Sequence, residues 1–108
     1  MSKHSAIEPA PVFAALGDRT RLALLARLSR GGERSIASLA GETALTRQAV
    51  TKHLQVLESA GLVRSARVGR ESRYAFSPEP MGAARAYLDD ISAQWDAALG
   101  RLKALVEE

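Results

Sequence analysis

The chain has 108 residues, enough for one domain with a modest core and too few for a second independent domain. Its composition, 46% hydrophobic and 25% charged, is that of an ordinary soluble domain, and no apolar run is long enough to span a bilayer. Cysteine is absent, which excludes disulfides, thiol chemistry and cysteine-ligated zinc. Since no apolar export signal follows the first residues, we expect a cytoplasmic protein with no membrane partner.

The formal net charge of +3 is spread unevenly along the chain. Residues 45–77 hold six basic and two acidic side chains, whereas residues 78–108 hold three basic and six acidic ones. A basic middle segment indicates an anionic partner there. The alternative is a solvated surface that happens to be basic.

The first ten residues are mostly small or polar and show no periodicity, so we predict a flexible N-terminal arm over residues 1–10. One domain then fills residues 11–108. Pro11 suits the first turn of a short helix that ends near Leu16, with Phe13 and Leu16 as its apolar contacts.

Two further helices follow, each with a residue that favours an N-cap. Asp18 precedes a helix over residues 19–30, in which leucine and alanine recur at helical spacing. Ser35 precedes a short helix over residues 36–41. The next four residues are expected to form a turn.

Thr46 caps a fourth helix that continues to Ala60 and is ended by Gly61. Two helices joined by about four residues fit the helix-turn-helix plan. The segments LVRSARV and ESRYAF then alternate like strands around Gly69-Arg70, which suits a type II′ hairpin turn. A last helix over about residues 81–106 completes a mainly α fold with a β-hairpin wing, a winged helix-turn-helix of about five helices and two strands.

The fourth helix has one polar and one apolar face when its residues are placed at about 100° intervals. Near its N-terminus the polar face holds the residue types that read DNA, since arginine bridges guanine, glutamine bridges adenine, and threonine and lysine suit bases or phosphates. We expect DNA contacts from Thr46, Arg47, Gln48, Thr51 and Lys52. His53 falls within the apolar face, where packing or a phosphate contact is favoured over metal ligation. The alternative is an ordinary solvated helix face.

Arginines surround the predicted hairpin tip at positions 67, 70 and 73. Such a tip can lie across phosphates or enter a narrow minor groove, so Arg67, Arg70 and Arg73 are further candidate DNA contacts. The alternative is a hairpin whose charges only discourage strand aggregation.

The last helix carries apolar residues at alternating spacings of three and four, a heptad seam that favours a partner helix. We expect a homodimer in which the first helix also takes part. Its predicted interface is Phe13, Leu88, Ile91, Trp95, Ala98, Leu102 and Leu105. The alternative is that the seam packs on its own domain.

The segments LGDRTRLALLARL, TRQAVTKHLQVLESAGLV and RVGRESRYAF together resemble the ArsR/SmtB family of bacterial winged-helix repressors, over roughly residues 12–106. The resemblance implies a homodimer that binds double-stranded DNA at an inverted-repeat operator and represses transcription, often of its own operon. The residues that match the family's DNA-contacting stretch and wing tip are Arg47, Gln48, Thr51, Lys52 and Arg70.

The chain departs from the family where many members bind metal, through cysteines in the third helix or through aspartate and histidine in the last. Here the third helix reads IASLAG and the last helix has no histidine. We therefore expect the metal-independent branch, with no metal site, no cofactor and an effector of unknown identity. A metal-responsive repressor, and a winged helix used for protein or RNA contact, stay open as alternatives. An enzyme is not expected, because no catalytic set and no glycine-rich phosphate loop can be assembled.

Overall fold

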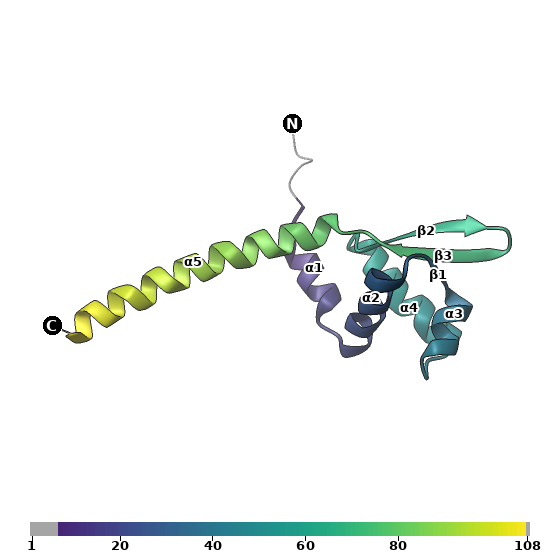
Figure 1. Cartoon of the computed structure of the whole chain (residues 1–108), viewed down its shortest axis with the longest axis horizontal. Helices are drawn as coiled ribbons and strands as arrows, with labels where there is room; N and C mark the ends of the chain where they lie inside the picture. Colours follow the sequence, from purple (N-terminus) through teal and green to yellow (C-terminus); the bar gives the residue numbers. More distant parts are fainter. Residues whose placement is uncertain (1–6, 108) are drawn as a thin grey trace, which may run out of the picture.

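The computed structural model describes residues 7–107, which form five α-helices and a three-stranded sheet (Figure 1). This architecture confirms the predicted helical fold with a β-hairpin wing. Residues 1–6 of the predicted arm lie outside the described residues. In chain order the elements are α1 (Pro9–Leu16), α2 (Arg19–Gly31), β1 (Arg34–Ser35), α3 (Ile36–Glu42), α4 (Arg47–Ser59), β2 (Val63–Val68), β3 (Glu71–Phe76) and α5 (Glu79–Glu107).

Helix α4 lies at the centre of the hydrophobic core. Its Val50, Leu54 and Leu57 are 0% exposed, and it contacts α2, α3 and β2. The predicted apolar face is confirmed at these positions, but Val56 at its edge is 41% exposed. Burial of one face leaves the polar face of α4 toward solvent. The other buried hydrophobic residues are Val12, Ala15, Leu24, Leu25, Leu28, Leu39, Leu62, Val63, Tyr74 and Ala84.

Helix α1 begins at Pro9, two residues before the predicted start, because a proline in the first turn lacks only an N–H that would have no partner there. Its buried residues are Val12 and Ala15. The predicted contacts Phe13 and Leu16 are only partly buried, although both pack against the core.

The three predicted N-caps are confirmed by hydrogen bonds from backbone N–H groups three residues further on. Each satisfies a donor that the first helical turn leaves without an intrahelical partner. The acceptors are Asp18 Oδ2 for Arg21 at 2.9 Å, Ser35 Oγ for Ser38 at 3.0 Å and Thr46 Oγ1 for Ala49 at 3.0 Å. The starts of α2, α3 and α4 are thus set by local sequence.

The end of α4 is fixed by Gly61, which adopts a φ of 78°. Its N–H donates to the Glu58 carbonyl at 2.9 Å, and the N–H of Leu62 donates to the Leu57 carbonyl at 2.9 Å. This pair of bonds is the Schellman arrangement, which needs a left-handed residue. A Cβ at position 61 would also lie 3.3 Å from Cγ of Pro80.

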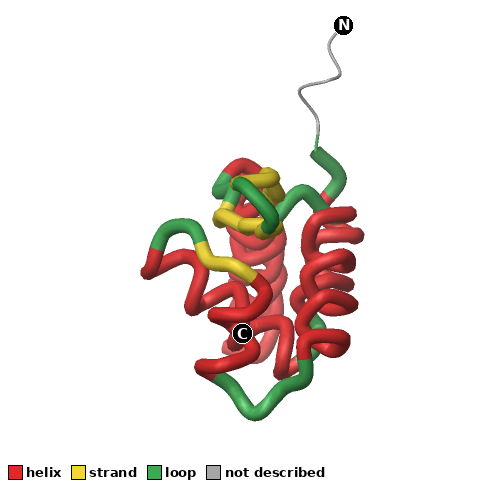
Figure 2. Tube along the Cα trace, turned by 90° about the vertical axis from the view of Figure 1, so that its right-hand side faces the viewer, coloured by secondary structure: helices red, strands yellow, loops and turns green. Residues whose placement is uncertain are grey.

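The sheet has the antiparallel order β1-β3-β2, so the hairpin gains a third strand that the sequence did not predict. Strand β1 has two residues, too few to show a period-two pattern. Gly69 in the hairpin turn has a φ of 63°, and no non-glycine residue in the described range has a positive φ. The type II′ turn expected here needs left-handed geometry at that one position. Figure 2, turned from the first view, shows the strands beside the bundled helices.

A short joint connects the wing to α5. The N–H of the buried Ser77 donates to the Leu62 carbonyl at 2.9 Å, and its hydroxyl donates to Oε1 of Glu79 at 2.8 Å. Only Pro80 and Ala84 of α5 are buried, α1 packs beside the first part of this 29-residue helix, and its C-terminal part projects away from the domain (Figure 1). Within residues 7–107, none of the helices has the length and apolar character that a membrane crossing requires.

The carboxylate of Glu42, at the end of α3, joins three elements. It accepts hydrogen bonds from Nη1 of Arg27 in α2 at 3.1 Å, from Nη1 of Arg34 in β1, and from Oγ of Ser38 at 3.1 Å. The hydrogen bond from Arg34, first of all, holds the pKa of Glu42 below its ordinary value. The network ties α3, the helix that supports α4, to α2 and to the sheet.

We expect Gly61→Ala to lower the free energy of unfolding by about 1–2 kcal/mol, because alanine is strained in the left-handed region. Urea denaturation at a fixed protein concentration measures the change. Gly41→Ala is the matched control, since a Cβ there meets no atom within 4 Å and the residue is helical. That control should gain about 0.5–1 kcal/mol. An unchanged Gly61→Ala protein would contradict the role of the left-handed cap.

We expect Glu42→Gln to reduce stability near neutral pH and to flatten its loss in acid. The folded pKa of Glu42 is depressed, so its contribution is present above the unfolded pKa and is lost as pH falls through the folded value. The measurement is the urea midpoint between about pH 6 and pH 3, around the ordinary glutamate pKa. Glu8→Gln, an exposed carboxylate without an ion pair in the described range, should follow the parent protein. Parallel pH curves for Glu42→Gln and its parent would refute this role.

Candidate nucleic-acid interface

The polar residues predicted to read DNA gather at the N-terminal end of α4. They surround an open depression of about 650 Å³, and all but the half-buried Thr51 are exposed. A helix face with free donors and a positive N-terminal dipole is suited to a polyanion. The structure brings together Thr46, Arg47, Gln48, Thr51 and Lys52.

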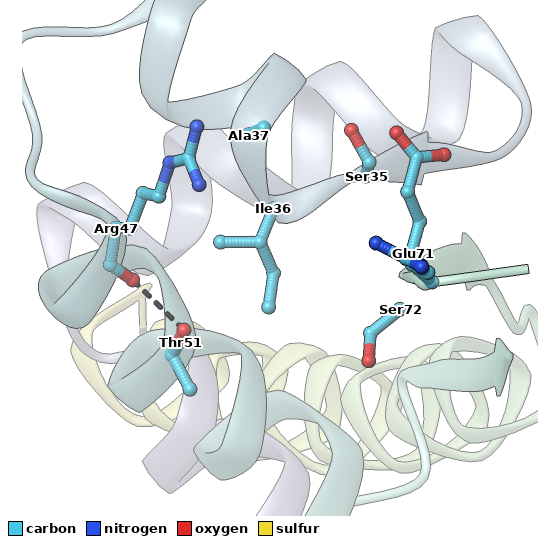
Figure 3. Close-up of a pocket in the computed structure, with 8 residues that line it drawn as sticks. Ser35, Ile36, Ala37, Arg47, Thr51, Glu71 and Ser72 are labelled. Atoms are coloured by element: carbon cyan, nitrogen blue, oxygen red, sulfur yellow. Dashed lines mark hydrogen bonds between the residues drawn. The ribbon is translucent and has the colours of Figure 1, made fainter.

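A second cavity, of about 340 Å³, lies between α3, α4 and the wing (Figure 3). Arg47 and Thr51 line it from α4, and Arg70 lines it from the hairpin turn. Figure 3 shows the Arg47 side chain extending toward Ala37 at the start of α3. The cavity therefore joins the N-terminal face of α4 to the tip of the wing.

Two serines that the sequence did not single out as DNA contacts also line this cavity, Ser35 before α3 and Ser72 in β3. Ser35 stood out only as an N-cap, and its Oγ accepts from the Ser38 N–H. Ser72 lies opposite Arg67 in the hairpin register. Only the pairing register reveals that Ser72 turns toward α4, so no local sequence signal could have found it.

The hairpin has two faces, and only one turns toward α4. Ser65 lies opposite the buried Tyr74, and its hydroxyl donates to Oε2 of Glu58 in α4 at 2.7 Å. Alternate residues of a strand share a face, so Arg67 lies on the same side as Ser65. Arg67 therefore lies on the side of the hairpin that faces α4, and Arg70 in the turn lines the cavity that α4 borders.

Arg73 lies on the opposite face of the hairpin. Its Nη2 is 3.0 Å from Oε1 of Glu71, and its Nε donates to the same oxygen at 3.1 Å. Its Nη1 is 3.9 Å from Oε1 of Glu33, just before β1. The three wing arginines, which the sequence grouped together, are thus divided by the pleat of the sheet.

His53 is partly buried, with its Nδ1 3.9 Å from Oδ2 of Asp18 at the start of α2. The backbone N–H of Arg21, more than any other group, lowers the pKa of Asp18 below its ordinary value. His53 therefore lies where α4 meets the N-terminus of α2, away from the exposed polar face. In the part of the chain that the structure describes, no three histidine, cysteine, aspartate or glutamate residues are grouped to hold a metal ion.

The residues predicted for a dimer interface form an exposed apolar stripe along α5. Trp95 is 64% exposed and Leu105 is 70% exposed, while Ile91 is partly buried. The stripe also includes Leu99, at 57% exposure, which the heptad seam left out. Phe13 of α1 contacts α5 through the Tyr87 ring, with centroids 5.9 Å apart.

Comparison with known proteins finds helix-turn-helix transcriptional regulators similar to this chain. A family model described as a helix-turn-helix domain matches residues 16–66. The chain is 42% identical over 76 residues to the uncharacterized HTH-type transcriptional regulator YuzN of Bacillus subtilis (strain 168). This alignment covers 65% of this chain and 83% of YuzN.

Solved structures agree over most of the chain. The ArsR-like transcriptional regulator from Rhodococcus sp. RHA1 is 40% identical, superposes with a TM-score of 0.80, and covers 95% of this chain and 96% of its own. The homodimeric winged helix-turn-helix DNA-binding domain Mb0332 from Mycobacterium bovis, solved by NMR, is 29% identical with a TM-score of 0.63, over 79% of this chain and 78% of its own. The chain therefore belongs to the ArsR/SmtB family of winged helix-turn-helix transcriptional regulators, DNA-binding proteins and not enzymes.

Proposed function

We propose that the protein is a homodimeric repressor that binds an inverted-repeat operator, including one upstream of its own gene. One observation carries the DNA-binding part: the N-terminal face of α4 and the wing tip border a shared cavity, with Arg47 and Arg70 on its two sides. A single DNA segment laid on this surface meets the helix and the wing together.

In the proposed complex the N-terminal half of α4 enters the major groove, which is about 12 Å wide and accepts a helix. Arg47 and Gln48 face base edges, where they can bond guanine and adenine respectively. Thr46 and Lys52 lie nearest the phosphates at the helix N-terminus. The Thr51 hydroxyl already donates to the Arg47 carbonyl at 2.8 Å, so its free lone pairs suit an amino group on a base edge better than a phosphate.

The wing contributes a second contact in this proposal. Arg67 lies on the side that faces α4 and Arg70 borders the cavity shared with α4, so both reach the backbone or minor groove beside the site that α4 reads. Arg73 is proposed to act mainly within the hairpin, because Glu71 neutralises its charge on the opposite face. Its long-range field still adds to the attraction of DNA.

The homodimer is supported by the exposed apolar stripe on α5 and by the homodimeric state of Mb0332. Large apolar patches on a small domain mark interaction surfaces. A two-fold dimer presents two copies of α4 related by the same symmetry, which matches an inverted repeat. Phe13, next to Tyr87, extends the proposed interface from α5 onto α1.

We expect the double variant Arg47→Ala, Lys52→Ala to raise the dissociation constant for the protein's own upstream DNA about a hundredfold, since a base contact and a phosphate contact are both lost. Fluorescence anisotropy with a labelled duplex measures it. Arg30→Ala removes a charge at the exposed end of α2 and serves as the control, with little change expected. Binding that survives the double variant would place recognition elsewhere on the protein.

The logarithm of the DNA association constant should fall linearly with the logarithm of salt concentration. Arg70→Ala should reduce this slope by about one unit if Arg70 neutralises one phosphate. Arg73→Ala should change it by clearly less, because Glu71 already pairs with that guanidinium. Equal changes in the two variants would refute the division of the wing into two faces. A response flat in salt would instead indicate a protein partner.

A further inference from the structure

A single carboxylate lies among the cationic and hydroxyl side chains of the cavity between α4 and the wing. Arg47, Thr51 and Arg70 line this cavity, and of the described residues around it only Glu71 is acidic. Figure 3 shows the Glu71 side chain across the cavity from Arg47. In the sequence, residues 61–77 contain four arginines and Glu71 as the one acidic residue. A negative charge on a surface that receives a polyanion opposes binding, so its presence calls for a separate role.

Arg73 approaches the Glu71 carboxylate with two of its nitrogen atoms. Nη2 lies 3.0 Å from Oε1 of Glu71, and Nε donates to the same oxygen at 3.1 Å. The third nitrogen, Nη1, is 3.9 Å from Oε1 of Glu33. In the pairing of β1 with β3, Arg73 lies opposite Ser35, which also lines the cavity. The guanidinium is therefore held at the edge of the proposed DNA surface, with its donors directed to carboxylates.

We propose that Glu71 is a positioning residue that sets the DNA specificity of the protein. It holds Arg73 off the DNA backbone and repels phosphate from its side of the cavity, so that binding to unrelated sequences is weakened. This inference rests on the proposed DNA interface and adds a repulsive element to it. Specificity is a difference between two affinities, and a group that opposes the wrong partner increases that difference.

The repulsion acts unequally on an operator and on other DNA. On an operator, the base contacts of α4 fix where the duplex lies, and the backbone follows one path. On an unrelated sequence the complex depends on phosphate contacts alone and adopts the placement that offers the most of them. A free Arg73 would add one such contact. With Glu71 present, that contact requires breaking the ion pair and bringing a phosphate beside a carboxylate.

A direct base contact by Glu71 gives the opposite expectation. A carboxylate can accept a hydrogen bond from the amino group of cytosine, so its removal would then weaken operator binding. The paired geometry favours repulsion, because Oε1 of Glu71 already accepts from Arg73. The sign of the change in operator affinity therefore separates the two roles.

Glu71→Gln in the full-length protein removes the charge while keeping a side chain of similar size. We expect its affinity for an unrelated duplex to rise about threefold, the range of an exposed charge pair. The salt slope for that duplex should steepen by about one unit, because Arg73 gains one phosphate. The affinity for the protein's own upstream DNA should rise less, so the ratio of the two affinities falls. Fluorescence anisotropy with the upstream duplex and a shuffled duplex of equal length and composition measures all three.

The double variant Glu71→Gln, Arg73→Ala tests whether Glu71 acts through Arg73. Its salt slope on the shuffled duplex should return close to that of the parent protein. Two single variants control for the change in net charge. Glu8→Gln removes a carboxylate at the start of α1, and Glu33→Gln leaves the 3.0 Å pair between Glu71 and Arg73 intact. Both should leave the salt slope nearly unchanged.

Three results would overturn the proposal. Weaker operator binding by Glu71→Gln would assign the carboxylate to a base contact. Equal gains on the upstream and shuffled duplexes would remove its role in specificity. A steeper slope that persists in the double variant would show that Arg73 is not the residue restrained. A parent protein that binds both duplexes equally, or without salt dependence, would instead refute the proposed DNA interface itself.

Discussion

Burial of one face of α4 is the constraint on which the rest of the structure depends. Val50, Leu54 and Leu57 have no solvent exposure, so the helix cannot rotate about its axis without exposing large side chains. This fixed rotation aims Arg47, Gln48 and Lys52 away from the core. The same residues therefore provide stability and orientation, and the recognition chemistry on the opposite face can vary without disturbing the core.

Polar contacts complete the positioning that the core begins. Glu42 joins α3 to α2 and the sheet, while Ser65 joins the wing to Glu58 of α4. Both contacts are hydrogen bonds between exposed side chains, outside the hydrophobic core. In the proposed complex they keep two separate DNA-contacting elements at a constant spacing, which lowers the entropy lost when both bind at once.

Local signals made the helices predictable, whereas features that depend on distant neighbours were not. Caps at Asp18, Ser35 and Thr46 act within one turn, so the sequence placed the helix starts well. Strand β1 exists only because β3 lies beside it, and Ser72 faces α4 only through the hairpin register. A 3.5-residue repeat also left Leu99 outside the seam, since the real period of 3.6 residues widens the stripe. Whether the predicted contacts touch DNA depends on a partner that the chain alone does not include.

Ser77 connects the base of the wing directly to the start of α5. Strand β3 passes into α5 within a few residues, and Ser77 bonds both to Leu62 at the end of the α4 segment and to Glu79. The start of α5 and the base of the hairpin therefore share one hydrogen-bonded support, so the direction in which α5 leaves the domain is set at the same point that anchors the wing.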